Sequence, residues 1–85
     1  MDKDIKELVK ERRMAFGMQC NTIASEIYDK LYERVLQWDG CGEVPTFTFH
    51  NDNLDVLIRV QIELTSFGLV VSQPTEDSLL IEIEE

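Results

Sequence analysis

The amino-acid sequence predicts an α+β domain in which a long N-terminal helix precedes a β-α-β-β unit. Three observations predict it. The first 38 residues contain no proline and carry apolar residues at helical spacing. Short alternating segments after Pro45 and near the C-terminus are typical of strands. A longer apolar segment with helix-capping residues separates them. We expect a small three-stranded sheet with helices on one face, and we treat residues 1–85 as a single domain.

The stretch from Asp2 to Trp38 is predicted to be helical, and Asp39–Gly40 with Gly42 ends it. Its second half carries a wide apolar stripe, which consists of Ile23, Ala24, Ile27, Tyr28, Leu31, Val35 and Trp38. Its first half continues an apolar face with Ile5, Leu8, Val9 and Phe16. Gly17 interrupts that face, and Asn21 or Thr22 could cap a new helix.

The length of this helix leaves two alternatives open. About 36 helical residues would span roughly 54 Å, whereas a globule of this size has a radius of gyration of about 12 Å. Either the helix breaks near Gly17–Asn21 and folds back, or its first half projects as an arm that pairs with another copy. We favour the arm, and with it a homo-oligomer.

Residues 54–67 are compatible with a strand or a helix, because their apolar residues fit both periods. Three features favour the helix. Its 14 residues are long for a strand. Asn51 or Asn53 can cap its start, with Asp52 and Asp55 near the first turn, and Gly68 sits where a terminating glycine belongs. We expect this helix to be buried on both sides, between the sheet and a second helix or subunit.

Three strands complete the prediction. Thr46–His50 alternates aromatic and polar residues, which is typical of a strand with one buried face. Leu69–Ser72 and Ser78–Glu84 are expected to form a hairpin around a turn at Gln73–Asp77. Its second strand should turn three apolar side chains inward, namely Leu79, Ile81 and Ile83.

The charge divides the chain at residue 38. Seven basic and seven acidic residues balance in residues 1–38, while residues 39–85 hold ten acids and only Arg59, and so carry the whole net charge of −9. Such a half repels phosphate backbones, so direct nucleic-acid binding is not expected. Its acidity either serves solubility or presents an acidic face to a basic partner. The candidate partner-binding residues are Glu43, Asp52, Asp55 and Glu63. Asp52 and Asp55 could also be an acid–base pair or metal ligands, but helix capping explains their presence more simply.

A basic cluster on the first helix is the candidate ligand site. Lys6, Lys10, Arg12 and Arg13 can simply pair with neighbouring acids, or they can hold an anion such as a nucleotide where helices from several copies converge. Trp38 can cap the core or stack on a ligand. The candidate ligand-binding residues are therefore Lys10, Arg12, Arg13 and Trp38.

No residue pattern predicts catalysis, a metal or a cofactor. Cys20 and Cys41 lack metal spacing, and His50 is the single histidine. A Cys41–His50 dyad is disfavoured because Asp39 and Glu43 would raise the thiol pKa. The sequence shows neither a secretory signal nor a membrane span, so we expect free thiols in a reducing cytoplasm.

The whole pattern resembles small accessory proteins of tailed bacteriophages. A long leading helix, a short strand and a capped helix ending in Leu64-x-x-Phe67-Gly68-Leu69-x-Val71 precede a closing hairpin. Those proteins often end on an aromatic residue, whereas this chain ends in Ile83-Glu84-Glu85. The resemblance implies a viral, non-enzymatic protein that binds and blocks a host macromolecule, or alternatively one that sequesters an anionic small molecule at subunit interfaces.

Overall fold

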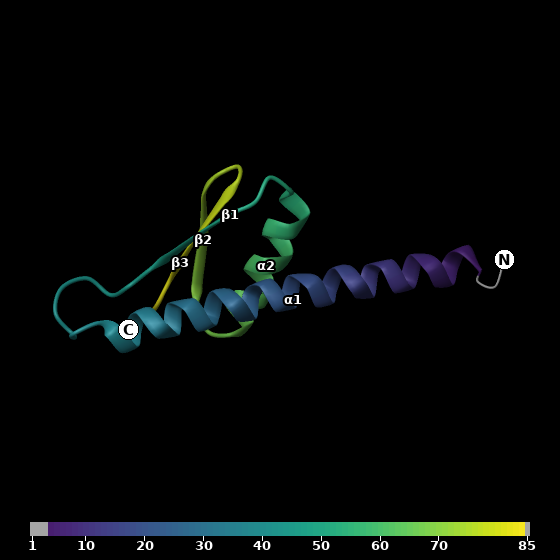
Figure 1. Cartoon of the computed structure of the whole chain (residues 1–85). Coiled ribbons are helices and arrows are strands. Elements are labelled where there is room, and N and C mark those ends of the chain that lie inside the picture. Colours follow the sequence, from purple (N-terminus) through teal and green to yellow (C-terminus); the bar gives the residue numbers. More distant parts are fainter. Residues whose placement is uncertain (1–3, 85) are drawn as a thin grey trace.

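The chain begins with one unbroken helix of 33 residues, α1 (Ile5–Gln37), in a computed structural model that describes residues 4–84 (Figure 1). Asp4 caps its start, since its carboxylate accepts a hydrogen bond of 3.3 Å from the Lys6 amide. The alternative of a break near Gly17–Asn21 is therefore wrong. Thr22 caps nothing, because its hydroxyl donates to the Met18 carbonyl inside α1. The predicted first residues of this helix, Asp2 and Lys3, lie outside the described residues.

Gly17 has a tertiary role within α1. A Cβ atom at this position would lie 3.3 Å from Nη2 of Arg59, a residue of the second helix, α2 (Leu54–Ser66). The glycine therefore lets the Arg59 side chain lie across α1, and it does not mark the end of a helix.

We expect Gly17→Ala to stabilise the protein by up to about 1 kcal/mol, because alanine is the better helix former. The nearby Nη2 atom is the end of a flexible side chain that is 47% exposed, so it can move aside. Urea denaturation of both proteins measures the difference. A loss of stability would show that Arg59 is held rigidly against α1.

The predicted helix over residues 54–67 is present as α2, which ends one residue earlier at Ser66, and its caps show why it forms. The side chain of Asn53 accepts a hydrogen bond of 3.0 Å from the Asp55 amide at the start. At the end Gly68 has φ +89°, and the amides of Gly68 and Leu69 donate to the carbonyls of Thr65 and Leu64. These are the two hydrogen bonds of a Schellman motif. The caps fix a helix in spite of the β-branched composition.

Only one stripe of α2 is buried within the chain. Val56, Leu57, Val60 and Leu64 face α1 and the sheet. The second apolar stripe that the sequence shows, Leu54, Ile58 and Ile62, is 53%, 47% and 58% exposed. α2 therefore lies between α1 and the sheet, as expected, and its second apolar stripe stays exposed.

The sheet has the order β1-β3-β2 and both pairings are antiparallel, with β1 at Phe47–His50, β2 at Val70–Thr75 and β3 at Ser78–Glu82. The α+β class, the element order and the helices on one face are as predicted. The predicted five-residue turn is wrong, because β2 continues to Thr75 and leaves only residues 76–77 as the turn. A register shift between Ser72 and Thr75 places one extra residue in this edge strand, which is where a proline such as Pro74 is tolerated.

The core begins only in the middle of α1. It comprises Cys20, Ala24, Ile27 and Leu31 of α1, four residues of α2, and Leu79 and Ile81 of β3. Every residue from 4 to 15 is exposed, and in Figure 1 this part of α1 projects beyond α2. We call residues 5–15 the arm. The molecule measures 60 × 25 × 17 Å with a radius of gyration of 15.9 Å, against about 12 Å for a globular chain of this length.

The described part of the chain contains no helix with the length and apolar character needed to cross a bilayer.

Candidate functional site

Two of the predicted ligand-binding residues meet at one cavity between the helices. Lys10 and Arg13 of α1 line an open cavity of about 570 Å³. Arg59 and Glu63 of α2 line its other side. The cavity therefore brings three cationic side chains and one carboxylate together, with the side chains of Met14, Met18, Asn21 and Thr22 completing its wall.

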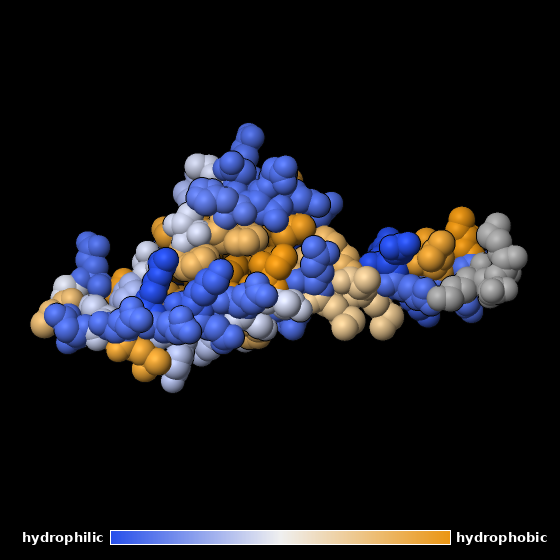
Figure 2. All heavy atoms as spheres, in the orientation of Figure 1, coloured by the Kyte–Doolittle hydropathy of each residue, from blue (hydrophilic) through white to orange (hydrophobic). Residues whose placement is uncertain are grey.

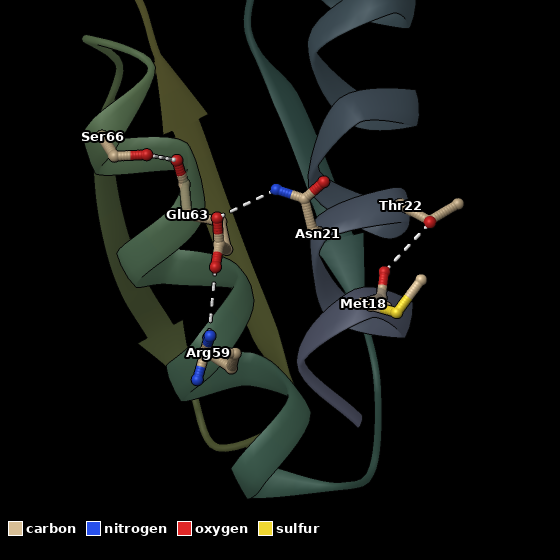
Figure 3. A network of polar contacts seen from close by, with 6 residues as sticks. All are labelled: Met18, Asn21, Thr22, Arg59, Glu63 and Ser66. Carbon is tan, nitrogen blue, oxygen red and sulfur yellow. Dashed lines mark hydrogen bonds and ion pairs between the residues drawn. The ribbon is translucent and has the colours of Figure 1, made fainter. Parts of the chain in front are cut away.

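Glu63 is the centre of a polar network across this helix pair (Figure 3). Its Oε1 accepts a hydrogen bond of 3.1 Å from Nε of Arg59, and its Oε2 accepts one of 3.1 Å from Nδ2 of Asn21. The hydrogen bond from Asn21, followed by that from Arg59, holds the pKa of Glu63 below its ordinary value of 4.5. Glu63, predicted from the sequence as a partner-binding residue, thus ties α1 to α2.

This network predicts a pH-dependent stability. Because the folded pKa of Glu63 is lowered, its contribution is fully present above the pKa of an unfolded glutamate and is lost as the pH falls through the folded pKa. The stability difference between the wild type and Glu63→Gln should therefore be constant near neutral pH and shrink below about pH 4.5. Urea denaturation across this range measures it.

Asn21→Ala serves as the matched variant, because it removes the largest cause of the shift and leaves the carboxylate in place. It should reduce the same pH dependence. A difference between the wild type and Glu63→Gln that does not change with pH would contradict the network.

The other two predicted ligand residues do not join this site. Arg12 is exposed and is not among the described residues that line the cavity. Trp38 lies 28 residues after Lys10, about 42 Å along the helix axis. Its Nε1 donates a hydrogen bond of 2.8 Å to the Cys41 carbonyl, so it fastens the loop after α1. A site containing all four residues cannot form within one chain.

The acidic candidates are also dispersed, but the fold creates an acidic cluster that the sequence did not predict. Glu43 lies in the loop after α1, whereas Asp52 and Asp55 lie at the start of α2. Asp52 lines a cavity of about 520 Å³ together with Glu76, Asp77, Leu54 and Gln73. The Asn51 amide donates a hydrogen bond of 2.9 Å to the Asp77 carbonyl, and this bond holds the hairpin turn beside the start of α2. We call Asp52, Glu76 and Asp77 the acidic cluster.

The cations at the other end of α1 hold the sheet. The Arg34 guanidinium lies 5.0 Å from the centre of the Phe47 ring and donates a hydrogen bond of 2.6 Å to the Thr46 carbonyl. The Lys30 ammonium lies 5.9 Å from the same ring centre. These contacts fasten β1 to α1.

The two thiols differ sharply in environment. Cys20 is fully buried in the core, and this burial raises the pKa of its thiol. Cys41 is exposed in the loop after α1, and His50 is exposed at the end of β1. Within residues 4–84 no three His, Cys, Asp or Glu side chains are grouped so that they could hold a metal ion.

Titration with a thiol reagent such as dithionitrobenzoate should therefore show two phases. Cys41 is expected to react at once, and Cys20 only when the chain unfolds, because the reagent needs an accessible thiolate. Cys41→Ala should remove the fast phase alone. Two fast phases in native buffer would contradict the burial of Cys20.

Comparison with known proteins returned no relative: no family model, no curated protein and no solved structure matches the chain.

Proposed function

We propose that the protein is a non-enzymatic binding protein that occupies a basic surface of another macromolecule with its acidic half, residues 39–85. The proposal rests on the exposure of the acidic side chains in this half. From Asp39 to Glu84 every acidic residue except Glu63 is exposed. Arg59, the only Lys or Arg of this half, is already paired with Glu63 at 3.1 Å. The negative potential of this half is thus available to a partner.

The mechanism is steric and electrostatic. Complementary charge accelerates the encounter with a basic partner and disfavours acidic ones. The bound protein then covers the surface that the partner uses for its own ligand. The resemblance to phage accessory proteins makes a host protein that binds nucleic acid, in the host cytoplasm, the partner we expect.

Affinity capture from a bacterial lysate tests the proposal with two charge-matched variants. Glu43→Lys with Glu84→Lys alters the acidic half, and Glu26→Lys with Glu33→Lys alters exposed positions of α1. Both pairs raise the net charge by the same amount. Mass spectrometry identifies the captured partner and measures its amount. We expect the first pair of substitutions to reduce this amount at least about tenfold, and the second pair to leave it unchanged. Equal effects of the two pairs, or capture that does not weaken with salt, would contradict a surface-specific interaction.

A second candidate function, capture of an anionic small molecule, is favoured by the cavity that Lys10, Arg13 and Arg59 line. Thermal shift with ATP and with inorganic phosphate tests it, and two adjacent arginines provide a control. Arg13→Glu should abolish a ligand-induced rise in the melting temperature, while Arg12→Glu should preserve most of it, because only Arg13 lines the cavity. The absence of any shift in the wild type would exclude both ligands.

A further inference from the structure

We infer that a second copy of this chain covers the exposed apolar surfaces, and that two chains bind reciprocally, the arm of each lying on α2 of the other. This inference goes beyond the basic partner proposed above and does not depend on it. It rests on two apolar surfaces of one chain, on their opposite flanking charges, and on the direction of α1.

The first surface is the arm. Ile5, Leu8 and Val9 are 75%, 43% and 49% exposed. Ile5 and Val9 precede Phe16 and Cys20 at spacings that keep all four on one face of α1. That face packs into the core from Phe16 onward and lacks cover before it. Figure 2 shows apolar surface near the free end of α1 beside hydrophilic side chains.

The second surface is the exposed stripe of α2. Leu54, Ile58 and Ile62 follow one another at intervals of four residues and form a ribbon about 12 Å long. Ile5, Leu8 and Val9 span four residue steps of the arm, about 6 Å, so they match about half of this ribbon. Leu54 also lines the cavity of the acidic cluster, so the α2 stripe begins beside three carboxylates.

The charges that flank the two surfaces are opposite. The arm holds four basic residues and two acidic ones, and its cations are Lys6, Lys10, Arg12 and Arg13. The α2 stripe is flanked by the acidic cluster in the half that carries the whole net charge of −9. An exposed apolar patch on each surface, with opposite flanking charge, makes the two surfaces complementary in both respects. Exposed apolar patches of this kind mark interaction sites.

Only the base of the arm approaches the α2 stripe of its own chain, where Arg13 lines a cavity of about 620 Å³ together with Ile58 and Asp55. The exposed apolar residues Ile5, Leu8 and Val9 lie farther toward the N-terminus of α1 and do not line this cavity. α1 is unbroken from Ile5 to Gln37, and the arm projects past α2 and away from the body (Figure 1). In a two-fold symmetric pair, the arm of each chain can lie on the α2 stripe of the other, because each chain supplies one arm and one stripe. Both contacts then form in the same event, so the pair has twice the interface of a single arm on a single helix.

A charge exchange tests this arrangement. One variant carries Arg12→Glu with Arg13→Glu, which makes the arm acidic. The other carries Asp52→Lys with Glu76→Lys, which makes the surroundings of the stripe basic. In sedimentation equilibrium the wild type should form dimers, and each variant alone should dissociate roughly 100-fold more readily, because like charges then oppose each other. An equimolar mixture should regain the dimer, since both reciprocal contacts are again between opposite charges.

The outcomes separate the alternatives. A wild type that stays monomeric at high micromolar concentration overturns the inference, and so does a mixture of the two variants that stays monomeric. If the Asp52→Lys, Glu76→Lys variant still dimerises alone, the arms pair with each other and the reciprocal arrangement is wrong. The capture experiment with Glu43→Lys and Glu84→Lys uses other residues, so the two proposals can fail separately.

A pair of apolar variants tests the contact independently of charge and with little risk to folding. Ile5→Asp lies in the arm, and Leu36→Asp lies near the other end of α1. Both side chains are exposed, by 75% and 69%. Ile5→Asp should abolish the dimer and Leu36→Asp should leave it intact. Equal dimerisation of both variants would overturn the assignment of the arm.

Discussion

Leu57→Ala is expected to lower the free energy of unfolding by about 2–5 kcal/mol, as large-to-small substitutions in protein cores do. Leu57 is fully buried in the core. At about 0.05–0.15 kcal/mol per residue, a chain of this length has a total stability of only about 4–13 kcal/mol. The variant should thus be much less stable, and urea denaturation at low protein concentration measures the loss.

Ile58→Ala is the matched control, because it changes the adjacent residue, which is 47% exposed. In the single chain it should cost less than about 1 kcal/mol. The two substitutions also distinguish a helix from a strand over residues 54–67. A strand with alternating burial would bury Ile58 with Val56 and Val60 and expose Leu57, so the larger loss would then come from Ile58→Ala. That result would contradict α2.

Gly68→Ala is expected to destabilise the protein by about 1–2 kcal/mol. Gly68 has φ +89°, a conformation that residues with a Cβ atom rarely adopt. A Cβ atom there meets nothing within 4 Å, so the cost comes from the backbone and not from a clash. The strain acts on the Schellman motif that ends α2.

Gly17→Ala is the control for Gly68→Ala, because the two substitutions should change the stability in opposite directions. The same substitution should stabilise the protein inside α1 and destabilise it at the end of α2, since the local backbone differs. Urea denaturation of both variants gives the two signs directly. A neutral Gly68→Ala would mean that the end of α2 adjusts freely and that the cap does not fix the helix.

The sequence predicts those helices and strands whose ends are marked by local residues. Asn53 and Gly68 mark both ends of α2, and this information outweighs its β-branched residues. It was insufficient where a distant contact decides the structure. Gly17 resembles a helix break until Arg59 is placed beside it. Pro74 resembles the centre of a turn, although the register shift in β2 accommodates it.

The candidate site shows the same division. Lys10 and Arg13 are three residues apart on one helix, so their meeting at one cavity follows from local geometry. Trp38 lies at the other end of α1, so the length of this helix separates it from both residues. Asp52 and Glu76 are far apart in sequence, and only the pairing of β1 with β3 brings the hairpin turn to the start of α2. No local pattern could have revealed that cluster.

The mass of the wild-type chain in solution tests most directly whether the arm is an interface between copies. One chain has a mass of 9.9 kDa. Sedimentation equilibrium at low to high micromolar concentration should show a mass that rises to twice this value, with Ile5→Asp remaining at the mass of one chain. A wild type that keeps the mass of one chain at every concentration would contradict the reciprocal dimer.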